Sequence, residues 1–292
     1  MIRPWKNNRR IEEERIRLSL PTEFLVGCGK CFGCLSNRRQ EYVARAKIEL
    51  ENTIYPSFVL TLTYSDEYLP ISDSGVPTLR TSDYQKFLKR LRKRFKPFRY
   101  FGCGEYGSTG LRPHYHIILF GLSPIKEEYQ GFEKEFFYKN IYDLWPFGMV
   151  KIDDVDGRVI SYCAKYVLLK GMSPPGTPKK DFEPPHVIVS RRPGLGSQWL
   201  ENADIVRWYK DDLERNGIFV DGSWARMPRY YSSKIYNHSE RDERHYRLKD
   251  RLNEELYKLG SDPKYRSEVL AHRHYLKTIY KTRMDYVTKS KL

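Results

Sequence analysis

The chain has 292 residues, and its 52 Lys and Arg against 37 Asp and Glu give a formal net charge of +15. This basic excess favours a polyanionic partner, and the 14% aromatic content, with 23 tyrosines, favours nucleic acid over an acidic membrane surface because rings stack on bases. No apolar run approaches the ~20 residues of a membrane span, and the N-terminus carries no secretory signal, so we expect no membrane partner.

Residues 1–23 predict a basic, irregular N-terminal arm, which is followed by Cys28, Cys31 and Cys34. Three thiols at this spacing are typical of a structural Zn²⁺ site. A fourth ligand is missing locally, although Cys103 or a histidine could supply it. The alternative is that the three cysteines stay reduced and pack a tight glycine-rich turn.

Two periodic elements follow a helix-favouring stretch at residues 36–51. Residues 58–64 alternate bulky and smaller side chains, which predicts a central strand. Residues 81–95 have a helical period, and Ser82 with Gln85 predicts a capping box at the start of this helix.

The helix expected at residues 81–95 belongs to a very basic segment, since Arg80 to Arg99 include nine Lys or Arg and a single acidic residue. A solvated face usually mixes charges of both signs, so we predict that this helix follows DNA phosphates. The DNA contacts predicted on it are Lys86, Lys89, Arg90 and Lys93.

Residues 99–106 and 114–120 predict the two strands of a hairpin. His114 and His116 would project to one side, because alternate residues of a strand share a face, and the hairpin would bring Glu105 beside His114. Two imidazoles and a carboxylate suit Mg²⁺ or Mn²⁺. Hydrogen-bonded core histidines and a salt bridge at the hairpin edge are the ordinary alternatives.

Residues 157–169 predict a helix that ends at Gly171, with Tyr162 and Tyr166 on one face and ~5–6 Å between their Cβ atoms. A half-buried aromatic stripe is the commoner use of such a pair. A phenol with a pKa near ~10 is almost fully protonated at neutral pH, so a tyrosine nucleophile needs help from Lys165 and from a metal ion that polarises the phosphate.

Prolines crowd residues 173–185, which predicts a linker. We therefore expect a core at residues 24–172 and a basic, largely helical region at residues 186–292 that closes with two helices. Arg191 and Arg192 are predicted DNA contacts in this second region.

Three segments in this order resemble the motifs of rolling-circle replication initiators of the HUH endonuclease superfamily. They are Val59-Leu60-Thr61-Leu62-Thr63-Tyr64, Arg112-Pro113-His114-Tyr115-His116-Ile117-Ile118-Leu119-Phe120-Gly121 and Tyr162-Cys163-Ala164-Lys165-Tyr166. Within the superfamily the chain is most similar to the initiators of microviruses, in particular the gokushovirus branch, which are related to the A protein of phiX-type phages.

The resemblance implies an α+β fold, in which a central antiparallel sheet similar to an RNA-recognition-motif palm carries flanking helices and a mostly helical C-terminal extension. It also implies a site with three metal ligands, two nucleophiles and an assisting lysine. These residues would be Glu105, His114 and His116, then Tyr162 and Tyr166, and finally Lys165. Arg112, in the second motif, is a further predicted DNA contact.

The activity that the resemblance implies is a metal-dependent nick in one strand of phage origin DNA. The nick would leave a 5′-phosphotyrosine and a free 3′-OH, and the second tyrosine would allow the product strand to be rejoined. A host helicase and DNA polymerase would be partners, in the cytoplasm of a bacterial host.

Two other interpretations of the sequence stay open. One is a single-stranded nucleic-acid-binding protein without catalysis, which would use the basic helix, the aromatic residues and a zinc module. The other keeps the chemistry but places it in a transposase or relaxase of the same superfamily.

Overall fold

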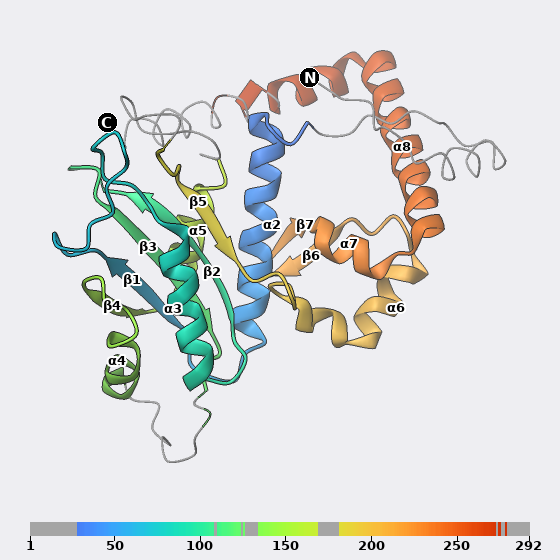
Figure 1. Ribbon diagram of the computed structural model, residues 1–292. Helices are drawn as coiled ribbons and strands as arrows, with labels where there is room; N and C mark the ends of the chain where they lie inside the picture. Colours follow the sequence, from blue (N-terminus) through green and yellow to red (C-terminus); the bar gives the residue numbers. More distant parts are fainter. Residues whose placement is uncertain are drawn as a thin grey trace, which may run out of the picture.

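The computed structural model describes residues 28–107, 110–123, 125, 134–168, 181–272, 274–275 and 278. Its centre is a five-stranded antiparallel sheet with strand order β4-β1-β3-β2-β5 (Figure 1). The strands are β1 (Phe58–Thr63), β2 (Arg99–Tyr106), β3 (Pro113–Phe120), β4 (Val150–Asp154) and β5 (His186–Val189). The predicted α+β class, with a central antiparallel sheet, is confirmed.

The middle of the sheet is built from strands rich in β-branched and aromatic residues, which favour a pleated, buried surface. His116 on β3 pairs with Thr61 on β1 and with Cys103 on β2. Gly102 lets β2 come this close, because a Cβ at that position would lie 2.1 Å from the carbonyl oxygen of His116. The histidine strand is therefore held between two neighbours.

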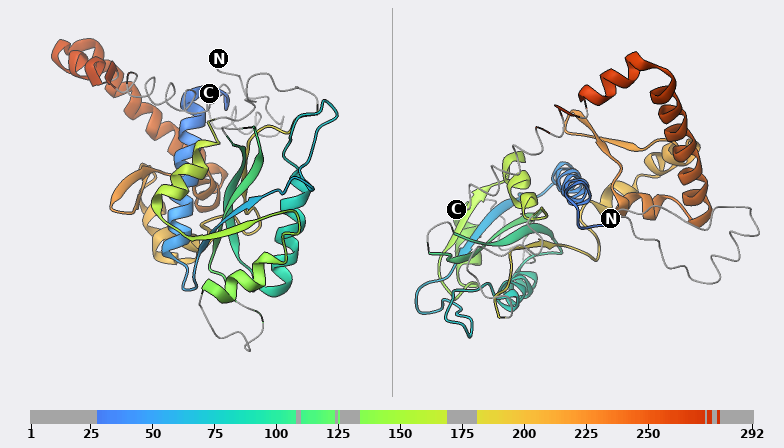
Figure 2. Two further views of the ribbon diagram at one scale, coloured as in Figure 1. Left: turned by 90° about the vertical axis from the view of Figure 1, so that its left-hand side faces the viewer. Right: turned by 90° about the horizontal axis from the view of Figure 1, so that it is seen from above.

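Two pairs of helices cover the two faces of the sheet (Figure 2). On one face, α3 (Thr81–Arg94) and α4 (Lys134–Tyr142) pack against the side of β1 that carries Leu60 and Leu62. On the other face, α5 (Gly157–Lys165) and α2 (Phe32–Glu51) pack against Ile118 and Phe120 of β3. Each face thus has its own apolar core.

Strand β5 lies beyond the proline-rich segment that we expected to end the core. It pairs with β2 through contacts such as Phe101 with Val189, and residue 183 also bonds to the core, where the Glu183 N–H donates to Thr78 Oγ1 at 2.9 Å. The boundary expected at residue 172 therefore falls inside the unit that forms the sheet. Residues 1–27 and 169–180, which include the expected arm and most of the expected linker, lie outside the described residues.

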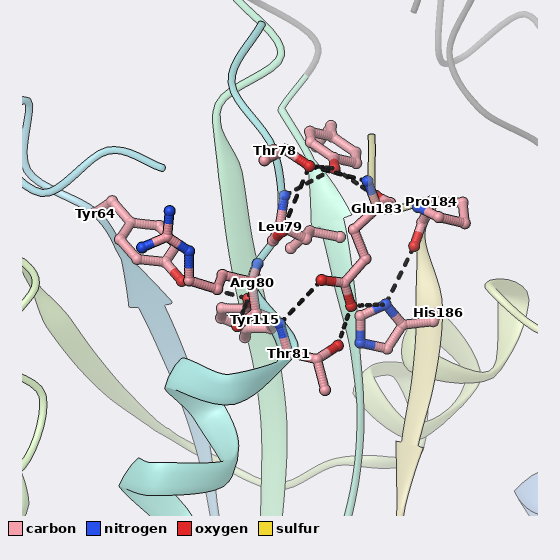
Figure 3. A network of polar contacts seen from close by, with 10 residues as sticks. Tyr64, Thr78, Leu79, Arg80, Thr81, Tyr115, Glu183, Pro184 and His186 are labelled. Carbon is pink, nitrogen blue, oxygen red and sulfur yellow. Dashed lines mark hydrogen bonds and ion pairs between the residues drawn. The ribbon is translucent and has the colours of Figure 1, made fainter. Parts of the chain in front are cut away.

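The start of α3 corrects another expectation. Its N-cap is Arg80 without a side-chain cap, so the predicted capping box of Ser82 and Gln85 is wrong. Glu183 takes that role from a distant part of the chain, since the Thr81 N–H donates to its Oε2 at 2.9 Å (Figure 3). A carboxylate at a helix N-terminus satisfies a free N–H and interacts favourably with the helix dipole.

The C-terminal region packs on the outer side of α2. Ala44 and Ile48 of α2 share an apolar cluster with residues such as Tyr209, Ile218 and Tyr231. The region consists of η2 (Ser197–Glu201), α6 (Ala203–Asp211), β6 (Gly217–Val220), β7 (Ser223–Arg226), α7 (Arg229–Ile235) and α8 (His238–Ser261).

The two expected closing helices are present: α8 ends at Ser261, and a further helical stretch occupies residues 263–272. The β6–β7 hairpin was not predicted. Among the described residues, no helix combines the length and the apolar character that a membrane crossing requires.

Candidate active site

The hairpin of β2 and β3 brings the three expected metal ligands together. Glu105 lies opposite His114 in the register of the two strands. Its Oε1 atom lies 3.0 Å from His114 Nε2 and 2.9 Å from His116 Nε2. The three candidate ligand atoms all lie within 4.8 Å of one another, so the convergence predicted for this motif is present.

The Nδ1 atoms of both imidazoles, on the side of each ring away from Glu105, also have polar partners. His114 Nδ1 donates to the backbone oxygen of Arg112 at 3.1 Å, and His116 Nδ1 lies 3.0 Å from Thr61 Oγ1. These contacts leave the Nε2 atom of each ring turned toward the Glu105 carboxylate. A metal-ligating histidine ordinarily has a second polar partner of this kind, which fixes the orientation of its ring.

Glu105 keeps a negative charge although it is only 3% exposed. Burial acts to raise the pKa of this carboxyl, but hydrogen bonds from His114, His116 and Tyr162 outweigh burial and hold the pKa well below its usual range. An ionised carboxylate and two imidazoles fit a divalent cation that has open positions left for phosphate oxygens.

Tyr162 reaches the same carboxylate from α5. Asp156 caps this helix by accepting a hydrogen bond from the Val159 N–H at 2.8 Å. The Tyr162 hydroxyl donates to Glu105 Oε1 at 2.5 Å, and its ring lies 5.4 Å from the His116 ring. Burial, followed by the bond to Glu105, raises the pKa of Tyr162 above its ordinary value. The residue is 37% exposed, so part of its side chain is open to solvent.

Tyr166 lies in a different environment from Tyr162. The helix ends at Lys165 rather than at the expected residue 169, and Tyr166 begins the turn that follows. It is only 1% exposed, yet its hydroxyl lies 3.4 Å from that of Tyr162. The Lys165 Nζ atom lies 4.0 Å from the centre of the Tyr162 ring and 5.3 Å from that of Tyr166, so one ammonium group makes cation–π contacts with both rings.

The basic helix α3 lies across the sheet from these groups. Its apolar side packs with Tyr115 and Ile117, the face of β3 opposite His114 and His116. Lys86, Lys89 and Lys93 are exposed there, and Arg90 is engaged by the backbone oxygen of Leu144 at 3.0 Å. The predicted DNA contacts of α3 therefore do not lie beside the candidate site residues.

Arg112 has structural partners beside the site. Its guanidinium donates to the backbone oxygen of Tyr64 at 3.1 and 2.8 Å and pairs with Asp66 at 2.6 Å. Arg191 and Arg192 are both exposed in the segment that follows β5. Arg191 also lines a pocket beside β5, whereas Arg192 does not.

The cysteine cluster forms a second candidate metal centre at the start of α2. The sulfurs of Cys28, Cys31 and Cys34 lie within 4.8 Å of one another. Hydrogen bonds from the backbone of Lys30 and then of Cys31 lower the pKa of Cys28 to about 6, which favours the thiolate that binds metal.

Cys103, considered above as a fourth ligand, lies elsewhere. It is buried beside Cys163 in the core between the sheet and α5. Among the described residues, no further His, Cys, Asp or Glu joins the three cysteines of the cluster. The suggestion that Cys103 completes a zinc site is therefore wrong.

With this geometry in place, the chain can be compared with known proteins. The family model for replication-associated proteins of the ORF2 type matches residues 57–171, the stretch that holds both site motifs. The replication-associated protein VP4 of Bdellovibrio phage phiMH2K is 30% identical over 237 residues, which cover 75% of this chain and 70% of the relative. The chain belongs to this family of microvirus replication-associated proteins.

Two other replication-associated proteins also match the chain. The replication-associated protein ORF2 of Spiroplasma virus 4 is 26% identical over 265 residues, which cover 86% of this chain and 78% of the relative. The replication-associated protein ORF4 of Chlamydia phage 1 is 28% identical over 225 residues, covering 73% of this chain and 54% of the relative. No solved structure matches this chain.

Thr61 is the residue of the site that sequence reasoning missed. The sequence places it in a predicted strand and in the first of the three motifs but gives it no role, yet its hydroxyl contacts a histidine of the triad formed by Glu105, His114 and His116. The available signal was the alternation of Thr61 and Thr63 with Leu60 and Leu62, which marks a polar face on a strand whose other face is apolar.

Proposed function

We propose that this microvirus replication-associated protein initiates rolling-circle replication by nicking one strand of phage origin DNA. A single observation carries the proposal: the hydroxyl of Tyr162 bonds to the same Glu105 oxygen that both histidines approach. A nucleophile beside a candidate site for a divalent cation is the arrangement that phosphodiester cleavage needs.

His114, His116 and Glu105 would hold the Mg²⁺ or Mn²⁺. When bound, this ion would supply positive charge that polarises the scissile phosphate. The Tyr162 oxygen would lose its proton to solvent and attack the phosphorus, the bond from phosphorus to the 3′ oxygen would break, and the leaving oxygen would take up a proton from solvent to become a 3′-OH. One phosphodiester replaces another, so the strand can later be rejoined without an external energy source.

The two tyrosines would act in sequence. Tyr162 contacts the triad and is open to solvent, which suits it to the first cut. Tyr166 is buried and contacts the hydroxyl of Tyr162 rather than the triad. Lys165, above the first ring and near the second, would stabilise either phenolate. Once Tyr162 carries the 5′ end of the DNA, Tyr166 would make the second cut.

The relatives support the biological setting. All three are named replication-associated proteins of microviruses, which favours replication over transposition or plasmid transfer. The chain contains no G-x-x-x-x-G-K-[ST] phosphate loop, so strand separation would come from a host helicase and extension from a host polymerase, in the cytoplasm of the bacterium.

A direct test uses labelled single-stranded DNA fragments that tile the phage genome. Incubation with Mn²⁺ is expected to give a covalent protein–DNA adduct on a denaturing gel, and chelation with EDTA is expected to abolish it. Tyr162→Phe should remove the first adduct, whereas Tyr166→Phe should retain it and lose strand transfer. Strand binding without an adduct on any fragment would support a binding protein without catalysis and sink the proposal.

We also propose that Cys28, Cys31 and Cys34 bind a structural Zn²⁺ ion. Three sulfurs in mutual reach and a Cys28 pKa of about 6 support this assignment. Metal analysis of purified protein should give near-unit zinc that Cys31→Ser releases. Zinc well below unit stoichiometry in protein purified without chelators contradicts the assignment and leaves reduced cysteines in a turn.

A further inference from the structure

A pocket of about 500 Å³ opens on the triad's face of the sheet. Its floor is β5, where Val187 and Val189 pair with Cys103 and Phe101 of β2 and so share the face covered by α2 and α5. Its walls come from α2, from the turn after α5 and from the residues that follow β5. This volume lies within the range of small-molecule sites in proteins.

The walls of the pocket are basic. Arg38 and Arg45 come from α2, Arg191 comes from the segment after β5, and no Asp or Glu is among the described residues that line it. Arg38 and Arg191 are exposed, so both can turn toward a ligand. The spacing of Arg38 and Arg45 places them on one side of the helix.

Arg45 is fixed at the back of the pocket. Its Nε donates to the backbone oxygen of Leu195 at 2.9 Å, and its guanidinium stacks on Tyr230 at 4.1 Å. Burial lowers its pKa, and among the described residues no carboxylate lies within 4.0 Å of it. The nearest acidic residues, Glu41 and Glu49 on the same helix, interact with Arg45 only from beyond ion-pair distance, so the guanidinium can still attract a negatively charged ligand.

Aromatic rings form another part of the wall. Tyr42, Tyr230 and Tyr166 all line the pocket. The ring of Tyr42 is held in place by Phe101, which it stacks on at a centroid distance of 5.6 Å and an angle of 27°. Arginines beside aromatic rings are the combination that binds the phosphate and the base of single-stranded nucleic acid.

Tyr166 joins this pocket to the candidate active site. It lines the pocket, and its hydroxyl lies 3.4 Å from that of Tyr162. The Tyr166 side chain therefore lies between a group held in the pocket and Tyr162, the proposed first nucleophile. This continuity separates the pocket from a general basic surface, such as the exposed side of α3 on the opposite face.

We infer that the pocket binds one nucleotide of the DNA strand next to the scissile phosphodiester, with its base against the rings of Tyr42 and Tyr230 and its phosphate on Arg38 and Arg191. The inference rests on the proposed function and adds to it the path of the strand. The DNA runs from the triad past Tyr166 onto β5, and this path keeps the strand beside the second nucleophile.

The test measures binding apart from cleavage. Fluorescein-labelled (dT)12 and a 12-residue strand of abasic sites are titrated by anisotropy in EDTA, so that charge is equal and only the bases differ. The wild-type protein should prefer (dT)12 by about tenfold or more, because each stacked base adds measurable affinity. Tyr42→Leu should reduce that preference to within about twofold, whereas Tyr42→Phe, which keeps the ring, should retain it.

The arginines are tested with the double variant Arg38→Ala and Arg191→Ala. Both strands should bind about tenfold more weakly at physiological salt, and the slope of log affinity against log salt should fall by about 1 to 2, as expected for two lost phosphate contacts. Arg207→Ala and Trp224→Ala, at exposed positions that do not line the pocket, should bind both strands within about twofold of wild type. Thermal melts establish that each variant is folded.

Two results overturn the inference. The first is that the folded pocket variants bind both strands as tightly as the wild-type protein does. If those variants and the wild-type protein still form adducts with genomic fragments, the proposed function stands without the pocket. The other is displacement of (dT)12 by micromolar thymidine monophosphate, which assigns the pocket to a free nucleotide. Pocket variants that lose binding while no protein forms an adduct would retain the inference as a strand-binding site and reject the proposed function.

Discussion

The two sides of a single tripeptide, His114-Tyr115-His116, have opposite environments. The Tyr115 side chain is fully buried between α3 and the sheet, where its ring lies 5.3 Å from that of Tyr84. Its hydroxyl accepts from the backbone N–H of Arg80 and donates to the backbone oxygen of the same residue, both at 2.9 Å (Figure 3). The histidines point the other way and meet at one carboxylate oxygen.

The difference concerns how polar groups are satisfied. The hydroxyl of Tyr115 has a donor and an acceptor of its own. On the histidine side, two imidazole nitrogens and the hydroxyl of Tyr162 compete for Glu105 Oε1. The first arrangement is complete within the protein, whereas the second gains from a cation. The same strand therefore contributes stability through one face and presents the candidate site on the other.

The largest expected effect comes from removing a ligand on the histidine side. His116→Ala should lower the rate of adduct formation by about a thousandfold or more, because the charge stabilisation from a bound divalent ion amounts to several kcal/mol. Single-turnover assays on the cleaved fragment measure this rate. The melting temperature should change little, since the side chain lies at the edge of the core, and a rate within about tenfold of wild type would contradict a metal site here.

Tyr115→Phe should have the reverse effect. The substitution keeps the ring but leaves the backbone N–H and carbonyl of Arg80 without their partner, which costs about 1–3 kcal/mol of unfolding free energy. Urea denaturation measures this loss. The rate of adduct formation in folded protein should stay within about twofold of wild type; a drop comparable to that of His116→Ala would mean that the two faces are not separate.

The opposite environments of the two faces of β3 were largely predictable from the sequence. The alternation of a strand requires that neighbours such as His114 and Tyr115 diverge, and hairpin pairing brings Glu105 to the same end of the sheet. Both arguments use only local geometry, which is why the triad can be found without a structure. The meeting of Tyr162 with this triad needed more, namely the resemblance to a known family.

What the sequence could not supply depends on contacts between distant segments. Helical period identified the buried side of α3 but not which face of the sheet it covers, so it could not place the lysines of this helix relative to the catalytic groups. The cap of α3 by Glu183 spans 102 residues, and the four-residue strand β5 becomes a strand only by pairing with β2. The burial of Tyr166 likewise arises in a cluster with Phe101 and Leu195, which lie far from it in the sequence.

The smallest expected effect tests how sharply the histidine side is organised. Thr61→Val replaces the hydroxyl that contacts His116 Nδ1 at 3.0 Å with a methyl group of similar size. Outer partners of metal-ligating histidines typically contribute about 10- to 100-fold in affinity, and because this one is only partly buried, water can replace it in part, so we expect a loss of about tenfold. Titration calorimetry with Mn²⁺ measures the change.

Thr63→Val is the matched control for this substitution. Thr63 lies on the same strand and the same face, where it pairs in register with His114, but its hydroxyl donates to the backbone oxygen of Met149 at 3.4 Å rather than to a histidine ring. The Mn²⁺ affinity of this variant should stay within about twofold of wild type. Equal losses in both variants would mean that strand polarity in general, rather than the bond to His116, sets the affinity, because the two changes remove the same group two residues apart.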